Sequence, residues 1–211
     1  MKYLIGIPCM DSLMTKFVQC VWALKHPKDA EAEVMLASGS LIYDARNQIA
    51  AKAVTGGFDR VLWLDSDMTF SSDLMVRLAE HLDNGLEFVS GIYVKRKQPI
   101  EPVIYEHGNM SRADGQSWLD YPKDQLFEVA ACGFGGVMMT TELIRAIGDV
   151  YGFPFSPILS VGEDLSFCYR ATALGRKLYC DSTIKLGHIG YVEFTEETYL
   201  KGRERSEVED E

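Results

Sequence analysis

RVLWLDSDMTF, residues Arg60–Phe70, is the stretch that decides the fold of this 211-residue chain. Its apolar run, Val61–Leu64, ends in two aspartates with one residue between them, Asp65 and Asp67. An uninterrupted apolar run is typical of a strand buried in a parallel sheet. Because ligands of open α/β sheets bind beyond the carboxyl ends of the strands, the aspartate pair is predicted to stand at a ligand site.

The spacing of the two aspartates indicates a divalent cation. Two carboxylates turned toward one point repel each other unless a cation lies between them, and a hard metal at a sheet edge suggests a phosphate-bearing substrate. A purely structural role stays open, because aspartates also cap turns and helices after strands. An EF-hand is excluded, since its sixth and twelfth positions would be Phe70 and Val76 instead of glycine and glutamate.

Composition restricts the class of protein. Hydrophobic residues make up 47% and charged residues 25%, as in a soluble globular domain. The net charge of −10 argues against a nucleic-acid partner, and no apolar run is long enough for a membrane span. The five cysteines are odd in number and include no Cys-x-x-Cys pair, which favours reduced thiols and a cytoplasmic location.

Strands and helices alternate through the first half of the chain. The pattern predicts strands at 3–7, 33–37, 60–64 and 87–94, and helices at 11–24, 45–54 and 72–82. Asp11 and Asp44 are the predicted caps of the first two helices. This alternation is typical of a parallel, doubly wound α/β sheet.

The second half is less regular. Residues 95–123 are rich in charge, proline and glycine, with one predicted strand near 103–105. Strands are predicted at 127–131 and 177–180, and helices after a cap at Thr141 and over 163–174. The highly charged residues 196–211 read as a tail.

Three later features carry candidate chemistry. Glu163 and Asp164 open a helix, where acids also serve as ordinary caps that the helix dipole stabilises. His188 stands alone among apolar residues and glycines, a setting that also suits a core histidine. The small-residue run at 130–136 allows close backbone packing with or without a ligand.

The order of these features resembles that of the GT-A glycosyltransferases, most closely the family 2-like members, over about residues 3–189. The resemblance implies a single-domain GT-A fold: a mostly parallel, doubly wound sheet with helices on both faces. It implies a domain over residues 1–195, with a nucleotide-binding half at about 1–94 and an acceptor-side half at about 95–195. Residues 196–211 would then be a charged C-terminal tail.

The resemblance also implies roles for single residues. In that family the Asp-x-Asp motif holds Mn²⁺ or Mg²⁺, which bridges the two phosphates of a nucleotide-sugar. Asp67 would be a direct metal ligand, Asp65 would serve the metal shell or the ribose, and His188 would be the third protein ligand. Asp164 would be the base that deprotonates the acceptor hydroxyl, with Glu163 beside it. The chemistry agrees, because a divalent ion neutralises a leaving diphosphate and the acceptor needs a carboxylate to take its proton.

Contacts to the donor are expected from residues in both halves of the chain. For Arg46 an exposed helix arginine is an equal alternative, and for Lys95 a solvated charge cluster is an alternative. The residues assigned to the nucleotide-sugar are Pro8, Arg46, Asp65, Lys95, Gly135 and Gly136.

The resulting hypothesis is a metal-dependent hexosyltransferase-like enzyme. It would move one sugar from a UDP- or GDP-sugar to a saccharide or other hydroxyl acceptor, with inversion if Asp164 is the base. A homo-oligomer is left open.

Two alternatives remain. LWLDSDMT also matches the first motif of haloacid-dehalogenase-like phosphatases, with Asp65 as nucleophile and Mg²⁺ as cofactor, although the later second acid is replaced by Cys168. The other alternative is a non-catalytic relative that kept the fold and binds a sugar or nucleotide.

Overall fold

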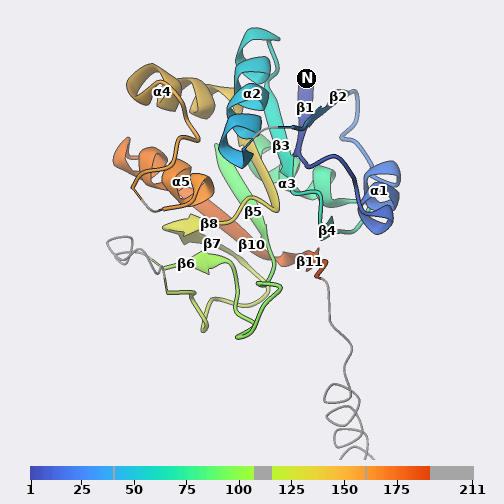
Figure 1. Cartoon of the computed structure of the whole chain (residues 1–211), viewed down its shortest axis with the longest axis vertical. Helices are drawn as coiled ribbons and strands as arrows, with labels where there is room; N and C mark the ends of the chain where they lie inside the picture. The colour runs from blue at the N-terminus through green and yellow to red at the C-terminus, as the bar shows by residue number, and fades with distance from the viewer. Residues whose placement is uncertain (40, 107–115, 160, 191–211) are drawn as a thin grey trace, which may run out of the picture.

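The computed structural model describes residues 1–39, 41–106, 116–159 and 161–190, and within them a seven-stranded sheet forms the centre of the molecule (Figure 1). Two short ladders of two strands each lie beside it. The strands are β1 (Lys2–Pro8), β2 (Glu31–Ala37), β3 (Arg60–Leu64), β4 (Met68–Thr69), β5 (Phe88–Ile92), β6 (Ile104–Tyr105), β7 (Leu126–Val129), β8 (Ala131–Cys132), β9 (Gly136–Thr140), β10 (Leu178–Lys185) and β11 (Gly187–His188). The helices are α1 (Thr15–Trp22), α2 (Ile42–Thr55), α3 (Leu74–Asp83), α4 (Thr141–Tyr151) and α5 (Glu163–Ala173).

The order of strands in the central sheet is β2-β1-β3-β9-β5-β10-β7. β2, β1, β3, β5 and β10 run in one direction, while β9 and β7 run in the other. The sheet is therefore mixed but mostly parallel, and the predicted α/β fold is confirmed. Because β9 is inserted between β3 and β5, the two halves of the sequence share one sheet and one domain.

Side chains on the two faces of the sheet pack into two separate core clusters. On β3, Val61 and Trp63 join the cluster beneath α2, α4 and α5, and Leu62 and Leu64 join the one beneath α1 and α3. This alternation explains why an uninterrupted apolar strand has helices on both faces. Trp63 is fully buried, so its replacement by alanine would cost about 3–5 kcal/mol.

The first two helices begin at residues other than the predicted caps. α1 begins after Met14 and α2 after Leu41, and neither residue makes a side-chain cap hydrogen bond. Asp11 lies outside the helix, and Asp44 lies inside the first turn of α2, where the helix dipole favours its charge. The prediction of these caps was wrong because packing of Phe17 and Ala45 into the core sets where each helix begins.

The second half differs in further details. The helix α4 is capped by Thr140, whose Oγ1 accepts from the Leu143 amide at 3.2 Å, and not by Thr141. The strand predicted at 127–131 is two strands, β7 and β8, which pair with different partners. The proposed tail at 196–211 lies outside the described residues.

The end of β10 matters most for function. The pairing of β10 with β5 shifts register between Asp181 and Lys185, and the chain then forms β11, which pairs antiparallel with β4. The late residues Gly187 and His188 thereby lie against Thr69 and Met68, directly after the aspartate motif.

None of the helices formed by the described residues has the length and apolar character needed to cross a membrane. All five cysteines lie within the described residues and are free thiols.

Candidate active site

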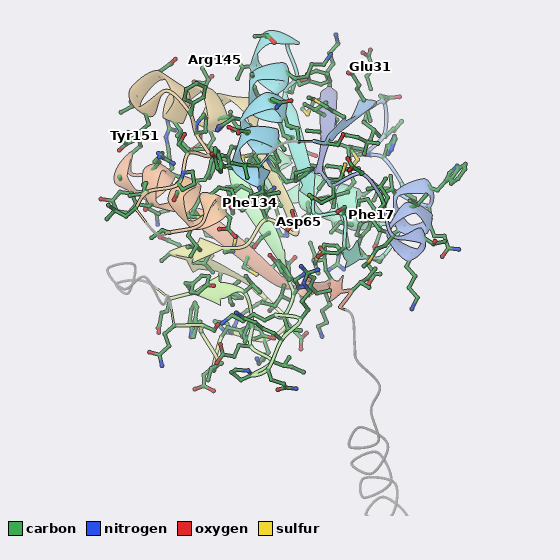
Figure 2. The ribbon with its side chains drawn as sticks, in the orientation of Figure 1. Phe17, Glu31, Asp65, Phe134, Arg145 and Tyr151 are labelled. Atoms are coloured by element: carbon green, nitrogen blue, oxygen red, sulfur yellow. The ribbon has the colours of Figure 1, made fainter. Side chains whose placement is uncertain are left out.

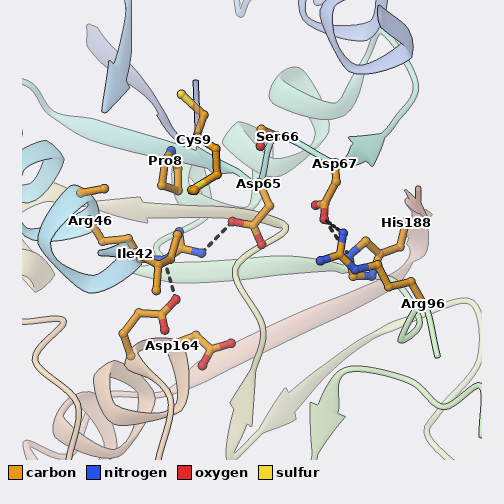
Figure 3. A pocket seen from close by; sticks show the side chains of 13 residues that line it. Pro8, Cys9, Ile42, Arg46, Asp65, Ser66, Asp67, Arg96, Asp164 and His188 are labelled. Carbon is orange, nitrogen blue, oxygen red and sulfur yellow. Dashed lines mark hydrogen bonds and ion pairs between the residues drawn. The ribbon is translucent and has the colours of Figure 1, made fainter. Parts of the chain in front are cut away.

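A pocket of about 380 Å³ opens where β1 and β3 reach their carboxyl ends (Figure 3). In the wider view of Figure 2, Asp65 lies near the centre of the molecule, between Phe134 and Phe17. The residues that line the pocket come from β1, α2, the segment after β3, the loop after β5, α5 and β11. The lining residues are Pro8, Cys9, Met10, Ile42, Ala45, Arg46, Asp65, Ser66, Asp67, Arg96, Glu163, Asp164 and His188.

Arg46 connects three elements at one side of this pocket. Its Nη2 donates to Asp65 Oδ1 at 2.7 Å and its Nε to Glu163 Oε1 at 3.1 Å (Figure 3). The side chain is only 2% exposed, and its guanidinium lies within 6 Å of the Phe134 and Trp63 ring centres. Burial alone would lower the pKa of Arg46, but the charges of Asp65 and Glu163 outweigh it and hold the pKa above its usual value. A buried cation therefore fixes both carboxylates.

Asp67 and His188 meet on the other side of the pocket. The β4–β11 ladder brings them together, and the Ile189 amide donates to the Asp67 main-chain oxygen at 2.7 Å. The His188 Nε2 lies 3.4 Å from Asp67 Oδ2, and its Nδ1 lies 3.0 Å from the Val94 main-chain oxygen. Because a carbonyl oxygen only accepts, Nδ1 carries a proton and Nε2 is the nitrogen that faces Asp67.

Arg96 also contacts the Asp67 carboxylate. Its Nη1 donates to the same Oδ2 that faces His188 (Figure 3). Burial alone would raise the pKa of Asp67, but the hydrogen bond and charge of His188 and the charge of Arg96 lower it below its usual value. Contact with Asp67 raises the pKa of His188 against the opposing effect of burial.

Asp164 lies in the first turn of α5, which begins after Gly162 without a side-chain cap. Its Oδ1 accepts from the Leu165 amide at 2.7 Å. Burial, reinforced by the neighbouring charge of Glu163, raises the pKa of Asp164 to about 6. This carboxyl group has no ion pair in the structure as described, in contrast to Glu163, which is held by Arg46. Such a carboxylate is a stronger proton acceptor than an exposed aspartate.

The structure brings most of the predicted site residues into this one pocket: Pro8, Arg46, Asp65, Asp67, Glu163, Asp164 and His188. Lys95 does not line it, because its Nζ is held by Glu101 Oε2 at 2.6 Å. Gly135 and Gly136 do not line it either. A Cβ at Gly135 would lie 2.9 Å from the Met68 side chain, and one at Gly136 would meet Leu186, so these glycines permit close packing below the pocket.

Several lining residues were not predicted. Arg96 takes the place expected for Lys95, and the sequence signal was the basic run of which both are part. Cys9 and Met10 follow Pro8, and Ser66 follows Asp65, so their position just beyond a strand end was the available signal. Ile42 and Ala45 are apolar residues of α2 that carry no chemical signal.

The pocket contains the types of ligand atom that Mn²⁺ and Mg²⁺ prefer, but these atoms do not converge on one point. A neutral His188 would direct its Nε2 lone pair at a carboxylate oxygen, which is favourable only with a proton or a metal ion between them. Carboxylate oxygen with one imidazole suits these metals. Asp65, however, is turned toward Arg46, and within the described ranges no three histidine, cysteine or acidic side chains form a metal-binding group.

Comparison with known proteins gives a fold but no family. No family model matches the sequence, and no curated protein matches it. The crystal structure of A197 from STIV is similar with a TM-score of 0.66 and 18% identity, over 90% of this chain and 87% of that chain. The crystal structure of GalNAc-T7 with UDP, GalNAc and Mn²⁺ is similar with a TM-score of 0.58 and 12% identity, over 91% of this chain. The match spans only 43% of the GalNAc-T7 chain.

At these identities the likeness concerns the fold. The resemblance to family 2 has no match at the level of sequence and stays a prediction. The strand order, the helices on both faces and the likeness to GalNAc-T7 agree, and the chain has a GT-A-like α/β fold.

Proposed function

We propose that this chain is a metal-dependent glycosyltransferase that moves a sugar from a nucleoside-diphosphate-sugar to an acceptor hydroxyl. The observation that carries the proposal is the single pocket that gathers Asp65, Asp67, Asp164 and His188 from three distant parts of the sequence. The GT-A-like fold supports it, as does the likeness to GalNAc-T7, whose structure contains UDP, GalNAc and Mn²⁺.

Asp67 and His188 are the residues that would hold Mn²⁺ or Mg²⁺, and Asp65 lines the same pocket beside Arg46. When bound, the ion would neutralise the negative charge that develops on the leaving diphosphate. His188 is prepared for this role by its Nδ1 hydrogen bond to Val94, which leaves Nε2 for the metal. Asp65 contributes indirectly by its ion pair with Arg46, which keeps its carboxylate oriented toward the pocket.

The donor would be a UDP- or GDP-sugar bound mainly by the half at 1–94, with the acceptor beside the half at 95–195. Arg46 supports this orientation, because its Nη1 is buried and has no hydrogen-bond partner within the described part of the chain. A buried N–H without an acceptor costs about 1–3 kcal/mol. An oxygen of the bound nucleotide-sugar that accepts from this N–H would recover that free energy. Pro8 and Arg96 are the other lining residues that we assign to the nucleotide-sugar.

Asp164 would be the base that takes the proton of the acceptor hydroxyl. With a pKa of about 6 it is mostly ionised at neutral pH and is more basic than an exposed aspartate. Glu163 would orient the site through Arg46 and would not take a proton itself. A base at this position implies inversion at the anomeric carbon.

The haloacid-dehalogenase-like alternative requires Asp65 as a nucleophile. Its Oδ1 accepts a hydrogen bond from the buried Arg46, which weakens it as a nucleophile. The GT-A-like fold also favours the transferase. The non-catalytic alternative predicts ligand binding without transfer, so it is separated by an activity measurement.

The test is a thermal-shift screen of UDP, GDP and their sugars with and without Mn²⁺. A ligand at one hundred times its dissociation constant stabilises the folded state by about 2.7 kcal/mol, and we expect that gain only with the metal present. A positive donor is then incubated with saccharide acceptors and the released nucleoside diphosphate is measured. Absence of stabilisation by every nucleotide, with and without Mn²⁺, would contradict the proposal.

A further inference from the structure

Arg96 stands where the proposed cation would bind. Its guanidinium contacts Asp67 Oδ2, the same oxygen that lies 3.4 Å from His188 Nε2. A guanidinium and a divalent cation repel each other, and one carboxylate oxygen cannot serve both in full. Arg96 is therefore an internal counter-ion of the aspartate motif, and a metal ion that binds Asp67 through Oδ2 would have to displace it.

Main-chain hydrogen bonds close the loop that carries Arg96, and the Arg96 side chain itself is half exposed. The Lys95 amide donates to the Glu101 main-chain oxygen at 2.8 Å, and the Val103 amide donates to the Tyr93 main-chain oxygen at 3.0 Å. These two hydrogen bonds close the loop between β5 and β6. Gly190 packs against the base of the Arg96 side chain, since a Cβ there would lie 3.2 Å from the Arg96 Cβ. The Arg96 side chain is 49% exposed, whereas that of Asp67 is 19% exposed.

The displaced guanidinium has a chemically suitable destination. Arginine has a planar set of donors that matches phosphate oxygens in pairs, and a nucleoside diphosphate in this pocket would bring those oxygens beside the loop. The other cation of the pocket, Arg46, is already held by Asp65 and Glu163. Arg96 is thus the lining cation with the freedom to move from a carboxylate to a phosphate.

We propose that Arg96 exchanges partners during donor binding: it neutralises Asp67 in the free protein and moves to the diphosphate when the metal ion takes its place. This inference rests on the proposed function, because it requires a metal ion and a diphosphate in the pocket. Its consequence is coupling. The metal ion frees Arg96 for the nucleotide, and the nucleotide draws Arg96 away from the metal ligand, so each raises the affinity of the other.

The test measures binding and not turnover. Mn²⁺ affinity is determined without nucleotide from the loss of the electron paramagnetic resonance signal of free Mn²⁺, and UDP affinity is determined by calorimetry in saturating Mn²⁺. The variants are Arg96→Gln, Arg96→Lys and Lys97→Gln. Lys97→Gln is the matched control, because it removes one positive charge from the same loop at a residue that does not line the pocket.

Opposite changes are expected in the two affinities. Relative to Lys97→Gln, Arg96→Gln should bind Mn²⁺ alone about three- to tenfold more tightly, because the competing cation is gone. In saturating Mn²⁺ it should bind UDP about three- to tenfold more weakly, because the phosphate contact is lost. Arg96→Lys keeps the charge without the paired donors, so it should restore most of the competition with Mn²⁺ but only part of the UDP affinity.

Equal Mn²⁺ affinities in Arg96→Gln and Lys97→Gln would overturn the exchange and leave the proposed function standing. A loss of both Mn²⁺ and UDP affinity in Arg96→Gln would also overturn it, since Arg96 would then support the site without competing for it. Absence of Mn²⁺ and UDP binding in the unmodified protein would overturn the exchange together with the proposed function.

Discussion

The Nδ1 atom of His188 lies 3.0 Å from the main-chain oxygen of Val94, and this contact turns the other ring nitrogen toward Asp67. The ring is also held edge-on against Tyr93, at 5.5 Å between centres. Orientation of a ligating histidine by a main-chain carbonyl is a common arrangement in metal sites. This orientation makes His188 Nε2 the nitrogen that would bind a metal ion.

Replacing His188 by alanine should reduce Mn²⁺ affinity by at least roughly tenfold, because one nitrogen ligand is lost. The measurement is a Mn²⁺ titration of the folded protein. His81→Asn is the matched control. His81 contacts Asp181 at 2.8 Å from α3, outside the pocket, so this variant should change stability and leave Mn²⁺ affinity unchanged. Equal affinities in the two variants would remove His188 from the site.

The two aspartates of the motif should respond differently to the same substitution. Asp67→Asn should abolish the Mn²⁺-dependent part of UDP binding with little loss of stability, because Arg96 is half exposed and His188 keeps its hydrogen bond to Val94. Asp65→Asn should cost roughly 1–3 kcal/mol of stability, because Arg46 is buried and loses a charged acceptor. Urea denaturation and calorimetry measure both effects. Unchanged Mn²⁺ dependence in Asp67→Asn would show that this carboxylate is not a ligand.

Substitution of the proposed base should separate binding from chemistry. Asp164→Asn should keep UDP affinity in Mn²⁺, because its contacts lie on α5 and not on the aspartate motif. Transfer to the acceptor should fall by roughly 10² to 10⁴, the usual contribution of general acid–base catalysis. A steady-state assay of nucleotide release measures this effect. Near-normal transfer would exclude Asp164 as the base.

The raised pKa of Asp164 predicts two pH dependences. Transfer should increase as pH rises through about 6, because the base must be ionised. For stability, the pKa in the folded state lies above the usual 3.8, so burial favours the neutral form. The contribution of Asp164 to the free energy of unfolding is therefore fully present below about pH 3.8 and is lost as the pH rises through about 6.

Asp164→Asn should remove this loss. The displacement of the pKa corresponds to about 3 kcal/mol at most, so the variant should be more stable than the unmodified protein at pH 8. The difference should shrink as the pH is lowered from 8 to 4.5 in urea denaturation experiments. A constant difference across this range would mean that Asp164 does not titrate as described.

The core of the fold was predictable from sequence because it depends on local pattern. The bounds of β3, Arg60–Leu64, are those predicted, since five consecutive buried positions leave no alternative. The start of α4 was one residue off, because adjacent threonines are equivalent in sequence and only the Thr140 side chain reaches the Leu143 amide. The insertion of the antiparallel β9 between β3 and β5 depends on long-range pairing and leaves no local signal.

The membership of the site was more predictable than its electrostatics. Two aspartates with one residue between them predict mutual repulsion that a cation relieves. The structure instead gives each carboxylate its own partner, Arg46 for Asp65 and Arg96 with His188 for Asp67. Those partners come from α2, from the loop after β5 and from β11, so their contacts depend on the complete fold and not on local spacing.

The short ladder between β4 and β11 also has a consequence for synthesis on the ribosome. Asp67 emerges early, but its main-chain oxygen gains the Ile189 amide only after β10 and β11 have been made. Domains tend to fold from the N-terminus while translation continues, so the first strands can assemble long before the histidine arrives. A nascent chain that has folded only its early strands therefore lacks His188, which lines the pocket. The sheet and the pocket are completed at the same time.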